Sequence, residues 1–173
     1  MSRILEGDNG SFLLDTTLAV ESEQTLRAMT HFGMTMTDGL NQAVDVHRWL
    51  TGCHALGGLV VAETMHGLET IDMPEEIARG GDTHSVHVRI VDRHKPYLES
   101  LVDEYDREDL VQFWAGAVTL TASLAERGAL EQPIYELLPG PHLYHVRVGV
   151  GPLAETTKKT PLRGVFRKLI WGE

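Results

Sequence analysis

The chain has 173 residues, of which 42% are apolar and 23% charged, and its formal net charge is −10. This length and composition exclude a mainly disordered chain and predict one domain of ordinary size with a buried core. No run reaches the roughly 18 apolar residues of a membrane span, and the lone Cys53 excludes an internal disulfide, so we expect a soluble cytoplasmic protein.

Charge divides the chain into two parts. Residues 1–157 hold 10 basic and 24 acidic side chains, whereas residues 158–173 hold 5 basic and 1 acidic, which gives net charges of −14 and +4. We therefore predict an acidic globular domain over 1–157 and a basic amphipathic segment over 158–173. An acidic body repels phosphates, which disfavours nucleic acid as a partner.

The first half of the chain is predicted to be mostly helical after one strand. The composition of residues 12–20, apolar with paired threonines, favours an edge strand. A short helix is expected over 22–33, and Thr37 or Asp38 is expected to cap a second helix that weakens or ends at Gly52. The inward positions of this second helix recur three and four residues apart: Leu40, Val44, His47 and Leu50.

A third apolar segment covers residues 53–68, and its pattern predicts a further helix. Gly57 and Gly58 in this segment would allow a neighbouring helix to approach closely. Downstream we expect, in chain order, a short helical turn over 74–79, a strand over 83–91, a helix from Pro96, a helix over 107–127, a turn at Pro133 and a strand over 142–150. The helix over 107–127 is the most hydrophobic, and we expect it to form the centre of the core.

Two short stretches repeat one another. HSVHVRI at 84–90 and HLYHVRV at 142–148 share the pattern His-x-x-His-Val-Arg-(Ile/Val). A long helix, a Leu-Glu pair and a proline precede each stretch in the same order. These observations leave two interpretations open: an internal helix-turn-strand duplication, or two paired strands that have converged on similar faces.

The alternation of these two strands suggests a candidate binding site. Period two places Val86, Val88 and Ile90 on one face and Ser85, His87 and Arg89 on the other. If the two strands pair, one face gathers His87, Arg89, His145 and Arg147. Such a face can be a solvated surface whose arginines pair with the acidic body, a site for a carboxylate or phosphate or an acidic partner, or a site where the two histidines hold a metal.

Histidines also suggest a metal centre on the helices. The chain has nine histidines, and Glu63-x-x-His66 has the spacing that di-iron bundles use in pairs, although only one copy exists here. If the second and third helices pack side by side, zinc or iron could be held by His47, His54, Glu63 and His66. The alternative is that His47 is a hydrogen-bonded core residue and the other two histidines lie on helix surfaces.

The carboxyl end predicts a basic amphipathic helix that begins at Pro161. The residues expected to dock on a partner are Arg163, Phe166, Arg167, Lys168, Leu169, Ile170 and Trp171. Three interpretations stay open: this segment packs on its own core, docks on another subunit, or contacts a membrane surface or nucleic acid. Its charge is opposite to that of the body, which favours docking on an acidic second copy.

From these observations we predict an α+β fold, a mostly helical single domain with a small antiparallel sheet that contains both His-Val-Arg strands. Because no catalytic constellation is assembled in the sequence, we expect a non-enzymatic structural, assembly or protein-binding subunit. It would form a homo-oligomer or join a larger particle. The alternatives are a metal-dependent enzyme, perhaps hydrolytic, that uses the His/Glu centre, and a sensor of a small anionic ligand.

Overall fold

The computed structural model describes residues 3–5, 10–74, 81–104, 107–130, 132–139, 142–147 and 154–161. The chain forms two compact units. Unit 1 consists of Met1–Arg48 and Met73–Ser123, and unit 2 consists of Trp49–Asp72 and Leu124–Glu173. The division by compactness therefore differs from the charge boundary between residues 157 and 158, which stays a prediction.

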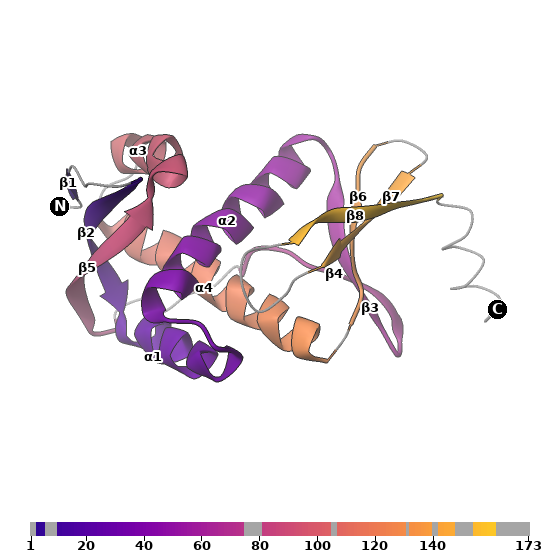
Figure 1. The fold of residues 1–173 in the computed structure, drawn as a ribbon, viewed down its shortest axis with the longest axis horizontal. Helices are drawn as coiled ribbons and strands as arrows, with labels where there is room; N and C mark the ends of the chain where they lie inside the picture. Colours follow the sequence, from indigo (N-terminus) through magenta and orange to yellow (C-terminus); the bar gives the residue numbers. More distant parts are fainter. Residues whose placement is uncertain are drawn as a thin grey trace. The chain divides into compact units, whose positions relative to one another are not determined.

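Unit 1 contains a three-stranded antiparallel sheet with the order β1-β2-β5 (Figure 1). Its strands are β1 (Arg3–Leu5), β2 (Ser11–Ala19) and β5 (Thr83–Val91). β2 and β5 pair over their full length, from Ser11 opposite Val91 to Ala19 opposite Thr83. The predicted strand at 12–20 is thus confirmed as a strand, but it is the central strand of this sheet and not an edge.

The predicted faces of β5 are confirmed. Val88 and Ile90 are buried, whereas Ser85, His87 and Arg89 are exposed. The alternation follows from the pleat, because successive side chains of a strand point to opposite faces.

The first helices of unit 1 follow β2 directly. α1 (Val20–Ala28) continues into the short helix η1 (Met29–Phe32), which ends at Gly33 with a positive φ of 76°. α2 (Met36–Ala55) begins with a capping box, in which the Asp38 N–H donates to the Thr35 hydroxyl at 3.1 Å and the Thr35 N–H donates to the Asp38 carboxylate at 3.1 Å. The cap is therefore Thr35, and the prediction of Thr37 or Asp38 was wrong.

The two later helices are α3 (Lys95–Glu104), which follows the short helix η2 (Asp92–His94), and α4 (Arg107–Ala129). α4 confirms the predicted core helix, since Trp114, Ala117, Val118 and Leu124 are fully buried. The Trp114 indole N–H donates to the Thr16 hydroxyl on β2 at 2.9 Å, so even the polar edge of this large side chain has a partner inside the core.

Unit 2 contains a five-stranded antiparallel sheet with the order β4-β3-β6-β7-β8 (Figure 1). In chain order its strands are β3 (Leu59–Thr64), β4 (Gly67–Thr70), β6 (Ile134–Leu137), β7 (His142–Arg147) and β8 (Ala154–Pro161). The prediction of a helix over 53–68 was wrong, because the chain leaves α2 and forms the β3–β4 hairpin. α2 also continues through Gly52 to Ala55.

Two glycines end α2 and start the hairpin. The Gly58 N–H donates to the Cys53 carbonyl and the Gly57 N–H to the His54 carbonyl, both at 2.9 Å, and Gly57 has a φ of +73°. This is the Schellman arrangement, which needs a residue that tolerates positive φ. A Cβ on Gly58 would lie 2.8 Å from both the Cys53 sulfur and the Leu137 carbonyl oxygen. The glycine pair therefore serves a helix end, not helix-helix packing.

The α+β class is confirmed, but the placement of the two His-Val-Arg strands was wrong. β5 pairs with β2 in one sheet, and β7 pairs with β6 and β8 in the other. Alternation fixes which face of a strand is buried but does not select its partner. The duplication stays a prediction, and the predicted turn over 74–79 lies outside the described residues except for Pro74. Within the described part of the chain, no helix is long and apolar enough to cross a membrane.

Candidate functional site

The four residues predicted to form one cationic face come from strands that do not pair. His87 on β5 lies with its Nδ1 3.6 Å from the Asp15 carboxylate on the neighbouring strand β2, and Arg89 is exposed. His145 and Arg147 belong to β7, where His145 is the register partner of Tyr135; their side chains lie outside the described residues. β5 and β7 do not pair, so strand pairing does not bring these four residues together, and their binding of an anion or an acidic partner stays a prediction.

The four candidate metal ligands are spread over three parts of the chain: His47 and His54 are on α2, Glu63 is on β3 and His66 is in the β3–β4 turn. The His47 Nδ1 lies 2.6 Å from the Tyr97 hydroxyl, and His54 lies 3.7 Å from the Asp72 carboxylate. Glu63 is on β3 and His66 is in the exposed turn of the hairpin, so they share no helix. Among the described residues, no three His, Cys, Asp or Glu side chains gather closely enough to hold a metal ion.

His47 is instead part of an aromatic cluster in unit 1. Its ring lies 4.7 Å from that of Phe113 in an edge-to-face arrangement, and Phe113 contacts Trp114 in the same way at 4.9 Å. Burial lowers the pKa of His47 to about 4, so the imidazole is neutral at pH 7. The sequence interpretation of a hydrogen-bonded core histidine describes this environment.

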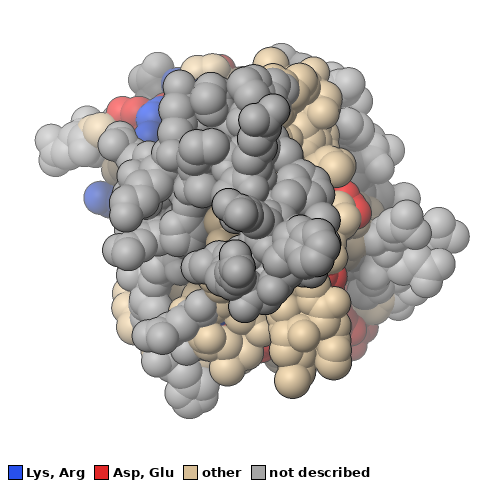
Figure 2. Space-filling view, turned by 90° about the vertical axis from the view of Figure 1, so that its right-hand side faces the viewer, with Lys and Arg blue, Asp and Glu red and all other residues tan. Residues whose placement is uncertain are grey.

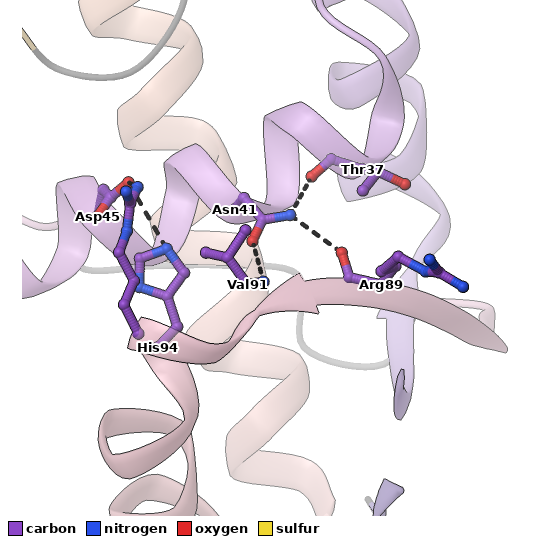
Figure 3. Close-up of polar contacts among 7 residues, drawn as sticks. Thr37, Asn41, Asp45, Arg89, Val91 and His94 are labelled. Carbon is purple, nitrogen blue, oxygen red and sulfur yellow. Dashed lines mark hydrogen bonds and ion pairs between the residues drawn. The ribbon is translucent and has the colours of Figure 1, made fainter. Parts of the chain in front are cut away.

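Asn41 links α2 to strand β5 in unit 1 (Figure 3). Its Nδ2 donates to the Thr37 carbonyl at 2.9 Å and to the Arg89 carbonyl at 3.1 Å, and its Oδ1 accepts the Val91 N–H at 3.0 Å. β5 is an edge strand of its sheet, so the Asn41 amide supplies partners where a further strand would otherwise pair. The sequence gives no local signal for this role, since it depends on residues about 50 positions apart.

One turn later on α2, Asp45 contacts two residues of η2 (Figure 3). Its Oδ2 accepts a hydrogen bond from Arg93 at 2.7 Å and lies 3.6 Å from the His94 Nε2. His94 is completely buried, and burial lowers its pKa; Asp45 opposes this effect, whereas Arg93 and Arg48 add to it. An uncharged imidazole therefore sits beside an ion pair.

Two buried polar side chains in unit 1 are unusual. Within the described part of the structure, neither ring nitrogen of His94 and neither amide atom of Gln42 has a hydrogen-bond partner. Such groups cost free energy when buried. Because no group of three possible metal ligands gathers among the described residues, these two residues do not by themselves define a site.

In unit 2 the polar contacts tie the strands and α4 together. The Tyr135 hydroxyl on β6 donates to the Glu63 carboxylate at 2.8 Å, and burial together with this bond raises the Tyr135 pKa to about 12. Arg127 of α4 donates to Glu69 of β4 at 2.9 Å. Burial, with Glu136 adding, raises the Cys53 pKa to about 11, so this thiol is protonated and is a poor nucleophile.

The clearest surface feature is a set of large apolar side chains that unit 2 leaves exposed. Met65 is 91% exposed and Leu130 is 70% exposed, although apolar side chains of this size are usually buried. Of the side chains that the structure describes, the large hydrophobic ones that are exposed all belong to unit 2: Leu56, Leu59, Met65, Leu68 and Leu130. Sequence reasoning missed this surface because it assigned 53–68 to a helix.

Three of these residues lie in the β3–β4 hairpin or directly after α4, and we call them the hairpin patch: Met65, Leu68 and Leu130. Met65 is in the β3–β4 turn, and Leu68 is opposite Glu63 in the hairpin register. Leu130 lies three residues after Arg127, which contacts β4, and three before Pro133, whose carbonyl accepts the Glu63 N–H at 2.9 Å. The signal that could have revealed the hairpin is the β-branched run in LVVAET after the glycine pair.

The predicted docking residues of the carboxyl end lie outside the described residues. Pro161 is the last residue of β8, opposite His142, so the chain is extended where a helix was expected to begin. The seven residues named above, from Arg163 to Trp171, follow this point. Their docking role stays a prediction.

Comparison of the chain with protein-family models, with curated proteins and with solved structures finds no match.

Proposed function

We propose that the protein is a non-enzymatic protein-binding subunit that self-associates, and that unit 2 provides the contact surface. One observation carries this proposal: the exposed large apolar side chains of the described chain are confined to unit 2. Scattered single hydrophobic residues are normal on protein surfaces, whereas their concentration in one part of a molecule is a feature of contact surfaces.

The free energy available from the hairpin patch is appreciable but limited. Complete burial of one Leu or Met side chain contributes about 1.5–3 kcal/mol, so three partly exposed ones supply roughly 5 kcal/mol. Association in the micromolar range needs about 8 kcal/mol net. The patch can therefore anchor a contact, and a stable assembly requires further complementary groups.

The proposal includes action in the cytoplasm. The single cysteine is buried and its thiol is protonated, which suits a reducing compartment. The exposed apolar residues of unit 2 can contact a second copy of the chain. A different protein with a complementary apolar surface could contact them in the same way and so build a larger particle.

Sedimentation velocity of the full chain over a series of concentrations tests this proposal. We expect concentration-dependent self-association, and the double substitution Met65→Asp with Leu68→Asp should weaken it at least about tenfold, which corresponds to about 1.4 kcal/mol. The matched control is Gln24→Asp with Gln112→Asp, which adds the same charge at exposed positions of unit 1. A wild-type chain that stays monomeric at every concentration would overturn the proposal, and equal weakening by both double variants would exclude the patch.

A further inference from the structure

Strand β5 lies at one edge of the unit 1 sheet, and its carboxyl-terminal end is covered there by a side chain of α2. Within the described part of the chain, β2 is the one strand that pairs with β5. The Asn41 amide bonds to the Val91 N–H and to the Arg89 carbonyl (Figure 3). These two residues therefore present their backbone groups on the side of β5 that faces away from β2.

The amino-terminal part of the same edge is open, and we call residues 83–87 the open edge. Backbone groups of an antiparallel strand alternate between its two sides, so Thr83, Ser85 and His87 face away from β2 as Arg89 and Val91 do. No described strand pairs with them on that side, and the side chains of all three are exposed. The open edge is about 17 Å long, the length of an ordinary strand.

The other edge strands that the structure describes have features that discourage further pairing. β1 has three residues and β4 has four, and β8 contains Lys158, Lys159 and Pro161. Short length, lysine and proline are common means by which proteins protect a sheet edge. β5 has nine residues and contains no lysine or proline, so the open edge lacks these protections.

The side chains of β5 indicate the charge of a complementary strand. β5 reads THSVHVRIV and contains no carboxylate. His87 lies near the Asp15 carboxylate of β2, but Arg89 is exposed and extends away from Asn41 (Figure 3). None of the ion pairs of the described residues includes Arg89. A carboxylate on an added strand would give this guanidinium a partner.

The net charge of −10 does not oppose such a partner at short range. Carboxylates are visible on the described part of the surface in Figure 2. Charges more than about 8 Å away are largely screened at physiological ionic strength, so the charge of Arg89 dominates beside the open edge. A second copy of β5 would instead bring histidine and arginine side chains against their own kind, which disfavours pairing of two copies.

We infer that the open edge binds an extended acidic segment of a partner protein, which adds to the sheet as an antiparallel strand. Backbone hydrogen bonds to Thr83, Ser85 and His87 supply the affinity, and a carboxylate that pairs with Arg89 supplies the selectivity. This inference concerns unit 1 and does not depend on self-association through unit 2.

The probe is a synthetic peptide of about nine residues that alternates glutamate with valine. Residues directly opposite Ser85 and His87 exchange both backbone hydrogen bonds with them and project their side chains to the Arg89 face, which places the glutamates there. Methylation of the glutamate amide nitrogens removes the required donors and should weaken binding to the full chain at least about tenfold, whereas methylation of the valine amides should not. Fluorescence anisotropy of labelled peptides measures each Kd.

A variant of the open edge tests the same contact from the side of the protein. Ser85→Pro removes an N–H that faces away from β2, which an edge strand tolerates, and should weaken peptide binding at least about tenfold. Ser85→Ala keeps this N–H and is the matched control. Hydrogen exchange at the Ser85 and His87 amides should slow when the peptide binds, whereas exchange at His84 and Val86, which face β2, should not change.

Exchange of charge between protein and peptide tests the selectivity. The wild type should bind the glutamate peptide at least about tenfold more tightly than a peptide with lysine at the same positions, and Arg89→Glu should reverse this preference. A wild type that binds the two peptides equally, or neither at about 1 mM, would overturn the inference. A wild-type dimer that Ser85→Pro abolishes would show that a second copy occupies the edge, and would overturn it as well.

Two controls separate this inference from folding and from the proposed function. The double variant Met65→Asp with Leu68→Asp should bind the glutamate peptide as the wild type does, even where its self-association is lost. Circular dichroism checks that Ser85→Pro folds. If it does not, the two methylated peptides still decide the question on the unchanged protein.

Discussion

Unit 1 and unit 2 differ in how far their large apolar side chains are exposed. In the described part of unit 1 the large apolar residues are in the interior. Two of its carboxylates pair with bases: Glu23 with Arg27 on the same helix α1, and Asp45 of α2 with Arg93 of η2. Unit 2 exposes large apolar residues around its hairpin and at the end of α4. This difference in exposed apolar side chains is the reason why we propose that the contact surface lies on unit 2.

A second difference concerns polar groups in the interior. Unit 1 contains neutral histidines, His47 and His94, and the unpartnered amide of Gln42. Unit 2 contains a protonated tyrosine–carboxylate pair and a buried thiol. We therefore expect the stability of unit 1 to depend more on the protonation of its histidines at mildly acidic pH. The stability of unit 2 should depend more on the close packing of Gly58 against Cys53 and Leu137.

The largest effect is expected from the core of unit 1. Replacing Trp114 with Ala removes a fully buried indole together with its hydrogen bond to Thr16, and we expect a loss of about 3–5 kcal/mol in the free energy of unfolding. Urea denaturation followed by circular dichroism measures this loss.

The neighbouring Gln112 is exposed on the same helix, and Gln112→Ala is the matched control with an expected change within about 0.5 kcal/mol. If Trp114→Ala cost no more than the control, unit 1 would not depend on this core and the contrast between the units would fail.

An intermediate effect is expected at the start of the hairpin in unit 2. Gly58→Ala would place a methyl group 2.8 Å from the Leu137 carbonyl oxygen and the Cys53 sulfur. The backbone has to shift, so we expect destabilisation by about 1–3 kcal/mol, measured by urea denaturation. Self-association should weaken as well, because the hairpin carries Met65 and Leu68.

Gly52 provides the opposite case on the same stretch of chain. It lies in α2, is exposed, and a Cβ there would meet nothing within 4 Å. Gly52→Ala should therefore stabilise the protein by about 0.5–1 kcal/mol through a higher helix propensity. Equal effects of the two substitutions would show that the Gly58 contacts are not specific.

The sequence predicted the elements whose pattern is long and regular. α4 and the strand β5 have bounds close to those expected, because helical spacing over about 20 residues and strict alternation are distinctive. Of the short strands of unit 2, β7 lies within the predicted strand over 142–150, whereas β4 and β6 were missed. β4 and β6 have four residues each, too few for either period to be recognised, and a continuous apolar run such as 59–62 fits a helix as well as a strand.

Contacts between residues that are far apart in the sequence could not be predicted from local sequence patterns. The side of β5 that carries Arg89 was predicted correctly, yet its partner is β2, about 70 residues earlier, because register is decided by matching apolar faces across the whole sheet. The same reason explains why Asn41, Asp45 and His94 were not singled out. Their contacts join α2 to residues about 50 positions later, and their side chains look ordinary in sequence.

A further small loss of stability is expected when unit 1 is exposed to mild acid. Burial lowers the pKa of His47 to about 4 from 6.5 and lowers that of His94 as well. Below pH 6.5 these histidines are protonated in the unfolded chain but stay neutral in the folded chain. Their contribution to the free energy of unfolding is therefore fully present above pH 6.5 and is lost as the pH falls toward 4. Because part of the His47 ring still meets solvent, we expect a loss of only about 1 kcal/mol from this residue between pH 7.5 and 5.

Urea denaturation at pH 7.5 and pH 5 measures this dependence. His47→Gln keeps a polar partner for Tyr97 but cannot titrate, so its loss of stability between the two pH values should be smaller than that of the wild type. His66→Gln, in the exposed turn of unit 2, is the matched control and should keep the wild-type dependence. If the His66 variant alone flattened the dependence, the acid-sensitive region would be the hairpin of unit 2. The assignment of buried neutral histidines to unit 1 as its cause would then be wrong.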